Sequence, residues 1–93
     1  HLKNVKTGEE TQLPVDGMFV FVGYEPQNSF LPAGLELDPQ GFIITDCEMR
    51  TNLPGLFAAG DIRSKMCRQV TTAVGDGATA ATAAFTYLEQ LDA

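Results

Sequence analysis

The sequence predicts an α/β chain in which several short strands are followed by one long C-terminal helix. Two observations indicate the strands: apolar runs at residues 18–23 and 56–61, the first closed by a glycine and the second by a Gly-Asp pair. One observation indicates the helix: residues 69–91 contain no proline, are rich in alanine and repeat apolar residues at helical spacing.

The bulk properties narrow the class of protein. The chain has 93 residues, of which 44% are hydrophobic and 19% charged, as is typical of a soluble globular protein. A formal net charge of −6 disfavours nucleic acid and anionic membranes as partners, because phosphate binding depends on Lys and Arg. No apolar run is long enough to span a membrane, and the N-terminus lacks a signal-peptide pattern. The first residue, His1, is expected of an excised segment and equally of a mature N-terminus.

The cysteines and the histidine argue against a CxxC redox motif and against a metal site in this chain. Cys47 and Cys67 are well separated and form no CxxC motif, so we expect reduced thiols in a cytoplasmic protein. The single histidine, His1, stands at the terminus, and no Cys/His cluster exists. No metal site is therefore predicted.

The first part of the chain predicts β-structure. Residues 1–15 alternate around a turn at Gly8-Glu9 and are typical of a hairpin, with Pro14 placing its strand near an edge or an end. Residues 18–23 (MFVFVG) form a continuous apolar run, which predicts a strand buried on both faces. Such a strand needs layers on each side, and a chain this small can hardly supply them.

The second part mixes loops with shorter strands. Prolines and glycines predict a loop over residues 24–41, residues 42–45 predict a short strand, and residues 51–55 predict a turn. Residues 56–61 predict another apolar strand. The long helix that follows contains Gly75 and Gly77, which close packing on a sheet or a cofactor would accommodate.

Gly60 and Asp61 stand where the strand of residues 56–61 ends. In open α/β sheets, ligands bind beyond the carboxyl ends of strands. Gly60 would let a ligand approach the backbone closely, and the Asp61 carboxylate would accept hydrogen bonds from a polyol such as a ribityl chain. A simple turn with Asp61 as a local cap explains the same two residues.

Arg68, Gln69 and Val70 open the long helix. A helix start presents free N–H groups and a partial positive charge, which favours an anion or a group that becomes anionic. A flavin fits this description, since its reduced ring carries negative charge near N1 and O2. A solvated helix start is the alternative interpretation.

Three segments together resemble the low-molecular-weight thioredoxin reductases. Residues 15–27 (VDGMFVFVGYEPQ) resemble the segment that leads from the NADPH domain back to the FAD domain, and residues 51–61 (TNLPGLFAAGD) resemble the second FAD motif. Arg68-Gln69-Val70 resembles the family's "RQ" helix start. The motifs stand in the family's order and spacing, and the resemblance covers essentially the whole chain.

The resemblance implies a cofactor-binding role for a set of six residues: Gly60, Asp61, Ile62, Arg68, Gln69 and Val70. Asp61 would hold the ribityl chain of FAD, and Gly60 would let the cofactor lie close. Gln69 and Val70 would present backbone N–H groups to the flavin pyrimidine edge, with Arg68 beside it. The link from Ile62 to Cys67 would pass along the cofactor. Val70 stands where the family often has Ala, and Cys67 where it often has an aromatic residue.

Absent motifs indicate what lies outside the chain. There is no GxGxxG and no CxxC, so neither dinucleotide phosphate site nor a redox disulfide is present. By resemblance, residues 1–24 would be the closing strands of an NADPH-binding domain with the interdomain link, and residues 25–93 the C-terminal part of an FAD-binding domain. The expected fold is thus a fragment of a flavoprotein with two Rossmann-like dinucleotide-binding domains.

The resemblance also implies an activity for the whole enzyme. Electrons would pass from NADPH through FAD to a redox disulfide and then to thioredoxin, in a cytoplasmic homodimer. No catalytic residue is expected in this chain, which alone would be inactive and would associate through exposed apolar surface. The alternatives are a related flavoprotein (a ferredoxin–NADP reductase or an alkyl hydroperoxide reductase subunit) and a non-enzymatic oligomerising fragment.

Overall fold

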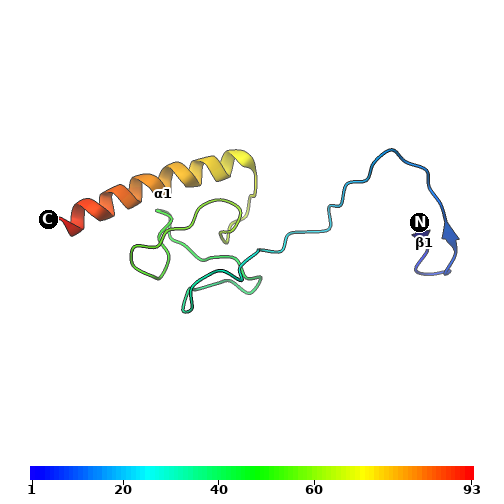
Figure 1. The fold of residues 1–93 in the computed structure, drawn as a ribbon, viewed down its shortest axis with the longest axis horizontal. Coiled ribbons are helices and arrows are strands. Elements are labelled where there is room, and N and C mark those ends of the chain that lie inside the picture. Colours follow the sequence, from blue (N-terminus) through cyan, green and yellow to red (C-terminus); the bar gives the residue numbers. More distant parts are fainter.

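The computed structural model describes all 93 residues and divides them into two unequal parts (Figure 1). An antiparallel hairpin of β1 (Leu2–Lys3) and β2 (Glu10–Thr11) lies at one end, and the helix α1 (Val70–Leu91) lies against a set of turns at the other. An extended segment, residues 12–24, joins them and is called the arm below; residues 25–93 are called the body. The molecule measures 69 × 27 × 21 Å. Its radius of gyration is 19.7 Å, against roughly 12 Å for a compact domain of this length.

The hairpin confirms the predicted one, although each strand has only two residues. In its turn, the Asn4 side-chain oxygen accepts hydrogen bonds from the N–H groups of Lys6 and Thr7, at 2.9 and 3.2 Å. Gly8 completes the reversal with φ 74°, a conformation that glycine adopts without strain. Every residue of the hairpin is exposed, so local hydrogen bonds rather than packing define it.

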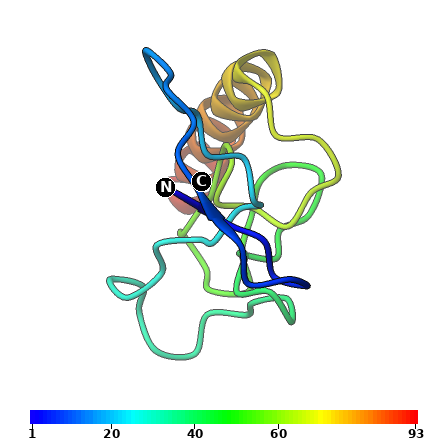
Figure 2. The same ribbon diagram turned by 90° about the vertical axis from the view of Figure 1, so that its right-hand side faces the viewer.

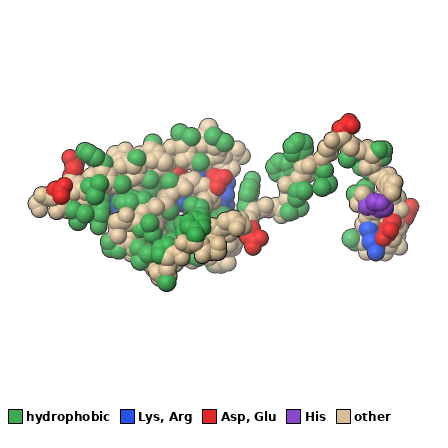
Figure 3. All heavy atoms as spheres, in the orientation of Figure 1, with side chains coloured by type: hydrophobic (Ala, Val, Ile, Leu, Met, Phe, Trp, Pro, Cys, Tyr) green, Lys and Arg blue, Asp and Glu red, His purple; other side chains and the backbone are tan.

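The arm contradicts the prediction of a strand at residues 18–23 with both faces buried. No strand forms there, and Phe19, Phe21 and Val22 are 88%, 87% and 90% exposed. A strand needs a neighbouring backbone for its hydrogen bonds and apolar layers over its faces, and the chain places neither beside the arm. Figure 3 shows hydrophobic side chains gathered along this narrow connection.

The body is built from turns that side chains close. The Asp38 carboxylate accepts the N–H groups of Gln40 and Phe42, both at 2.9 Å, and Asp46 closes the next turn in the same way. These hydrogen bonds satisfy backbone N–H groups that have no partner in a sheet, and they fix the path of the chain around the core.

The predicted strands at residues 42–45 and 56–61 are reduced to isolated bridges. Ile43 pairs with Leu37 and Arg63, and Phe57 pairs with Arg50. Regular strands are absent because a sheet requires further neighbouring strands, and the body contains none. The buried hydrophobic core is correspondingly small and consists of Phe42, Ile43, Met49, Ala58 and Ala83.

The helix α1 confirms the predicted C-terminal helix and begins one residue later than expected, at Val70. Its inner face packs on the turns: Ala83 is buried, and the Tyr87 ring stands edge-on to Phe57 with centroids 6.1 Å apart. Figures 1 and 2 show the turns along one side of α1 only. The other side carries exposed hydrophobic residues, among them Val74 and Phe85. No helix here combines the length and the apolar character needed to cross a bilayer.

Candidate cofactor-binding site

The centre of the candidate site is the turn Gly60–Arg63, called the site turn below. Gly60 is buried and has φ 84°, a left-handed conformation that L-residues with side chains rarely adopt. The Arg63 N–H donates to the Gly60 carbonyl at 3.1 Å and closes the turn. Asp61, at the crest, is exposed, and its carboxylate has no hydrogen-bond or ion-pair partner within the chain. Its two oxygens are therefore available to a ligand.

Arg68 holds the site turn from the outside. Its Nε donates to the Asp61 carbonyl oxygen at 2.9 Å, and its Nη2 donates to the Arg63 carbonyl oxygen at 3.0 Å. The guanidinium carbon also lies 3.6 Å above the centre of the Phe42 ring, in a cation–π contact. Arg68 thus fixes the backbone of the turn while leaving the Asp61 carboxylate unengaged.

The start of α1 lies next to Arg68. Gln69 is the N-cap residue, with extended backbone angles, and its N–H donates to Thr72 Oγ1 at 3.2 Å. The first hydrogen bond to the N-cap carbonyl runs from Ala73 N to Gln69 O, so the Val70 N–H precedes the helical ladder. Val70 is 79% exposed. An unbonded N–H and the positive end of the helix dipole therefore face open space at this point.

A cavity of about 370 Å³ lies in front of the site turn. Its lining includes three of the predicted site residues, Asp61, Ile62 and Arg68. The remaining lining residues come from the last residue of the arm and from the body: Tyr24, Glu25, Pro26, Gln27, Phe30 and Phe42. Gly60, Gln69 and Val70 do not line the cavity. The structure thus brings three of the six predicted residues together in one cavity and leaves the other three out of its lining.

The sequence interpretation missed a group of charged residues behind the site turn. The Asp76 Oδ2 atom, on α1, lies 2.9 Å from Arg63 Nη1 and 2.8 Å from Lys65 Nζ, and it accepts the Gly60 N–H at 3.0 Å. The side chains of Arg63, Lys65 and Asp76, called the Asp76 cluster below, are only 11%, 10% and 13% exposed. The Arg63 Nε also donates to Thr45 Oγ1 at 2.8 Å.

The ionisation of Asp76 follows from these contacts. Burial alone would raise the pKa of the carboxyl, but hydrogen bonds from Lys65, Gly60 and Arg63 outweigh burial and lower it below 3.8. Asp76 is therefore held as a carboxylate. A sequence signal existed: one acidic residue between two glycines of the helix, preceded by two basic residues in the linking loop.

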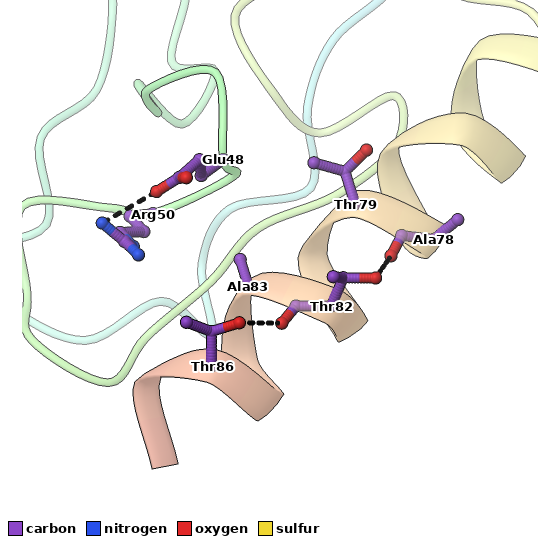
Figure 4. A pocket seen from close by; sticks show the side chains of 7 residues that line it. All are labelled: Glu48, Arg50, Ala78, Thr79, Thr82, Ala83 and Thr86. Atoms are coloured by element: carbon purple, nitrogen blue, oxygen red, sulfur yellow. Dashed lines mark hydrogen bonds and ion pairs between the residues drawn. The ribbon is translucent and has the colours of Figure 1, made fainter. Parts of the chain in front are cut away.

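A second hollow, of about 360 Å³, lies between the turn at residues 46–50 and α1 (Figure 4). Its polar groups are largely engaged: Glu48 pairs with Arg50 at 2.8 Å, and the Thr82 and Thr86 hydroxyls donate to helix carbonyls one turn back. It contains none of the predicted site residues. Cys47 and Cys67 are both exposed free thiols, and neither lines this hollow or the cavity at the site turn.

The residues present fit part of a flavin dinucleotide. The free Asp61 carboxylate suits a chain of hydroxyl groups, the missing side chain at Gly60 keeps the turn tight, and the start of α1 suits a polar ring edge. No cradle for a diphosphate lies in these residues, because the glycine-rich phosphate motif is absent from the sequence. The site therefore has the donors and acceptors for one portion of the cofactor.

A match to a family model gives the class of protein. Residues 1–77 match the family model described as pyridine nucleotide-disulphide oxidoreductase, and the chain belongs to this family. The predicted membership in the Rossmann-like FAD/NAD(P)-binding fold is thereby confirmed.

Thioredoxin reductases are among the proteins to which the chain is most similar. It is 53% identical to the thioredoxin reductase of Listeria innocua over 90% of this chain and 26% of that protein. It is 52% identical to the thioredoxin reductase of Treponema pallidum over 97% of this chain and 29% of that protein. The crystal structure of thioredoxin reductase from Streptococcus pyogenes superposes with a TM-score of 0.79 and 48% identity, over 95% of this chain and 29% of that one.

These relatives confirm the resemblance drawn from the three motifs. The chain spans less than a third of the length of each of these reductases. The match to the S. pyogenes structure covers nearly the whole chain, so the arm and the body follow a path similar to that of one region of a whole reductase.

Proposed function

We propose that this chain supplies the ribityl-binding turn and the flavin-edge helix start of an FAD-dependent disulfide oxidoreductase of the thioredoxin reductase type. One observation carries the proposal: the Asp61 carboxylate lies unpartnered at a cavity, on a turn that Arg68 and Gly60 fix. A carboxylate that only capped its own turn would be bonded to backbone N–H groups, as Asp38 and Asp46 are in the same body.

The residues divide the binding of FAD among them. Asp61 accepts hydrogen bonds from the ribityl hydroxyls, Gly60 allows the close approach, and Ile62 supplies an apolar wall of the cavity. Gln69 and Val70 present the helix start to the pyrimidine edge, and Arg68 keeps the turn and the helix start in register. Bound FAD supplies the chemistry of hydride and electron-pair transfer, and this chain orients it.

The proposal assigns the rest of the machinery to other polypeptide. Residues 1–24 would be the closing strands and link of the NADPH-binding domain, and residues 25–93 the C-terminal part of the FAD-binding domain. The NADPH site, the diphosphate cradle and the redox disulfide lie outside these residues, because the motifs that build them are absent. We infer thioredoxin as the electron acceptor, and a cytoplasmic homodimer as the working form, from the resemblance to thioredoxin reductases.

The test uses a chimera in which this chain replaces the matching region of the S. pyogenes thioredoxin reductase. The rest of that reductase then completes the protein. We expect the chimera to bind FAD and to pass electrons from NADPH to thioredoxin. Asp61→Ala should weaken FAD binding about 10- to 100-fold, because hydrogen bonds to a charged group are lost. Asp16→Ala, which removes an exposed carboxylate from the arm, is the matched control and should bind FAD as the unmodified chimera does.

Two results would contradict the proposal. An Asp61→Ala chimera with unchanged FAD affinity would show that this carboxylate does not hold the cofactor. Stoichiometric FAD on the isolated 93-residue chain would show that the site is complete without the rest of a reductase. If the chimera reduced ferredoxin or a peroxiredoxin in place of thioredoxin, the proposed flavin site would still stand. The proposed electron acceptor would then be wrong.

A further inference from the structure

The site turn is anchored from two opposite sides. On one side, the Arg68 guanidinium donates to the carbonyl groups of Asp61 and Arg63. On the other side, the Asp76 carboxylate accepts the backbone N–H of Gly60. The Gly60 N–H is buried, and a buried backbone donor needs a partner. In a sheet this partner would be a strand, but here it is a carboxylate on α1.

The bond to Asp76 sets the direction of the residue that follows. Gly60 has φ 84° at the start of the turn, so the orientation of Asp61 depends on how the Gly60 backbone is held. Asp76 Oδ2 fixes the N–H side of Gly60, and Arg63, bound to the same oxygen, closes the turn through its own N–H to the Gly60 carbonyl. One carboxylate oxygen therefore restrains both ends of the site turn.

The same oxygen also connects the turn to two other segments. Lys65 brings the loop that follows the turn onto α1, and Arg63 bridges from Asp76 to Thr45 in the neighbouring segment. The helix start at Gln69 lies two turns before Asp76 on the same helix, so the ribityl-binding turn and the flavin-edge helix start share one rigid element.

We propose that Asp76 is a positioning residue for FAD: it holds the site turn on α1, so that the Asp61 carboxylate and the start of α1 meet one cofactor in a fixed relation. The inference rests on the proposed function, since it names how the same site is held. Asp76 itself does not line the cavity, and its effect acts through Gly60 and Arg63.

Charge balance explains why a carboxylate stands here rather than a neutral acceptor. Arg63 and Lys65 are nearly buried beside Asp76, and two buried cations without an anion would carry a large desolvation cost. An amide at position 76 could accept the Gly60 N–H but would leave both cations uncompensated. The proposal therefore predicts graded effects for different substitutions at this position.

The test uses the chimera with S. pyogenes thioredoxin reductase and three substitutions. We expect Asp76→Ala to weaken FAD binding at least about tenfold, Asp76→Asn to have an intermediate effect, and Asp76→Glu to restore most of the affinity. Hydrogen exchange of the peptide over residues 56–62 should quicken in the same order, because the Gly60 N–H loses its acceptor. Glu89→Gln removes an unpaired carboxylate from the same helix and is the matched control.

The outcomes separate this inference from the proposed function. If the unmodified chimera bound no FAD, both would be overturned. If it bound FAD and Asp76→Ala bound FAD within about twofold with unchanged hydrogen exchange, the positioning role alone would be overturned. If Asp76→Ala failed to fold, Asp76→Asn would serve as the test, because the amide has the same shape as the carboxylate. An Asp76→Asn chimera with the FAD affinity of the unmodified chimera would overturn the charge-dependent role.

Discussion

The arm and the body respond in opposite ways to the same shortage of neighbouring strands. Residues 18–23 are the most strongly apolar part of the sequence, yet they stay extended and exposed. The body contains many more turn residues, yet it buries a small core and Gly60 of the site turn, and it packs one face of α1. Hydrophobicity alone therefore does not decide which region folds.

The difference lies in where the hydrogen-bond partners come from. The body satisfies its backbone with side chains close in sequence, such as Asp38 and Asp46, and with a helix that bonds to itself. A two-faced strand has no such local solution, because every N–H and C=O must find another strand. The backbone of the arm consequently needs hydrogen-bond partners from other polypeptide. The body already contains the partners for its own backbone.

The largest effect is expected from replacing apolar residues of the arm. The isolated chain should self-associate through the arm, and Phe19→Lys with Phe21→Lys should weaken association about 10²- to 10⁴-fold, because each buried Phe contributes roughly 1.5–3 kcal/mol. Light scattering over a concentration series measures this. Leu2→Lys with Val5→Lys adds the same charge to the hairpin and should change little; a monomeric unmodified chain would contradict the prediction.

A smaller effect is expected in the body, at the site turn. Gly60→Ala should lower the free energy of unfolding by about 1–2 kcal/mol, since a residue with a Cβ is strained at positive φ. The added Cβ would lie 3.7 Å from Ala73 Cβ, an ordinary contact, so the strain is conformational. Urea unfolding followed by the helical circular dichroism signal tests this. Gly17→Ala, in the arm, has open space and no positive φ, and equal losses for both variants would disprove the reasoning.

Acid should weaken the body and leave the arm unaffected. The pKa of Asp76 is lowered in the folded chain, so its stabilising contribution is complete above its ordinary value of 3.8 and is lost as pH falls through the folded pKa. Asp38 acts in the same direction, because the Ser64 hydroxyl lowers its pKa. Urea midpoints measured from about pH 6 down to about pH 3 should therefore decline, and less steeply in Asp76→Asn. Parallel profiles for the two proteins would exclude this role of Asp76.

The smallest effect is expected at Gly77, and it shows whether this side of α1 is exposed or covered by other polypeptide. No atom lies within 4 Å of a Cβ added at Gly77, so Gly77→Ala should stabilise the isolated chain by up to about 1 kcal/mol through helix propensity. In the chimera with S. pyogenes thioredoxin reductase, other polypeptide should cover this side of the helix, and the gain should shrink or reverse. Thermal unfolding of the two pairs of proteins gives the comparison; an identical gain in both would place Gly77 on a free surface.

The fold was predictable where local signals determine it. The hairpin and α1 were predicted within a few residues, because a turn with Gly8 and a proline-free apolar repeat are properties of short segments. The prediction of a strand at residues 18–23 was wrong for this chain, because no partner strand lies beside these residues. Residues 42–45 and 56–61 retained only the bridges at Ile43 and Phe57 for the same reason.

The candidate site was predictable in its residue types but not in its support. Asp61 and Arg68 could be selected because they follow a strand and precede a helix, and both line one cavity. The binding of Asp76 to the Gly60 N–H could not be read from the sequence, because it depends on how α1 lies on the site turn. The side chain of Lys65 is almost buried for the same reason.

The short span of the Asp76 contacts has a consequence for the order of folding. The side-chain bonds that join the site turn, the neighbouring Thr45 and α1 connect residues 11 to 18 positions apart. Loops of this length close at little entropic cost, and contacts of low sequence separation form quickly. The part of the site that we propose binds the ribityl chain should therefore assemble early. Under the proposed function, the slow step would then be the addition of the distant polypeptide that we propose holds the diphosphate.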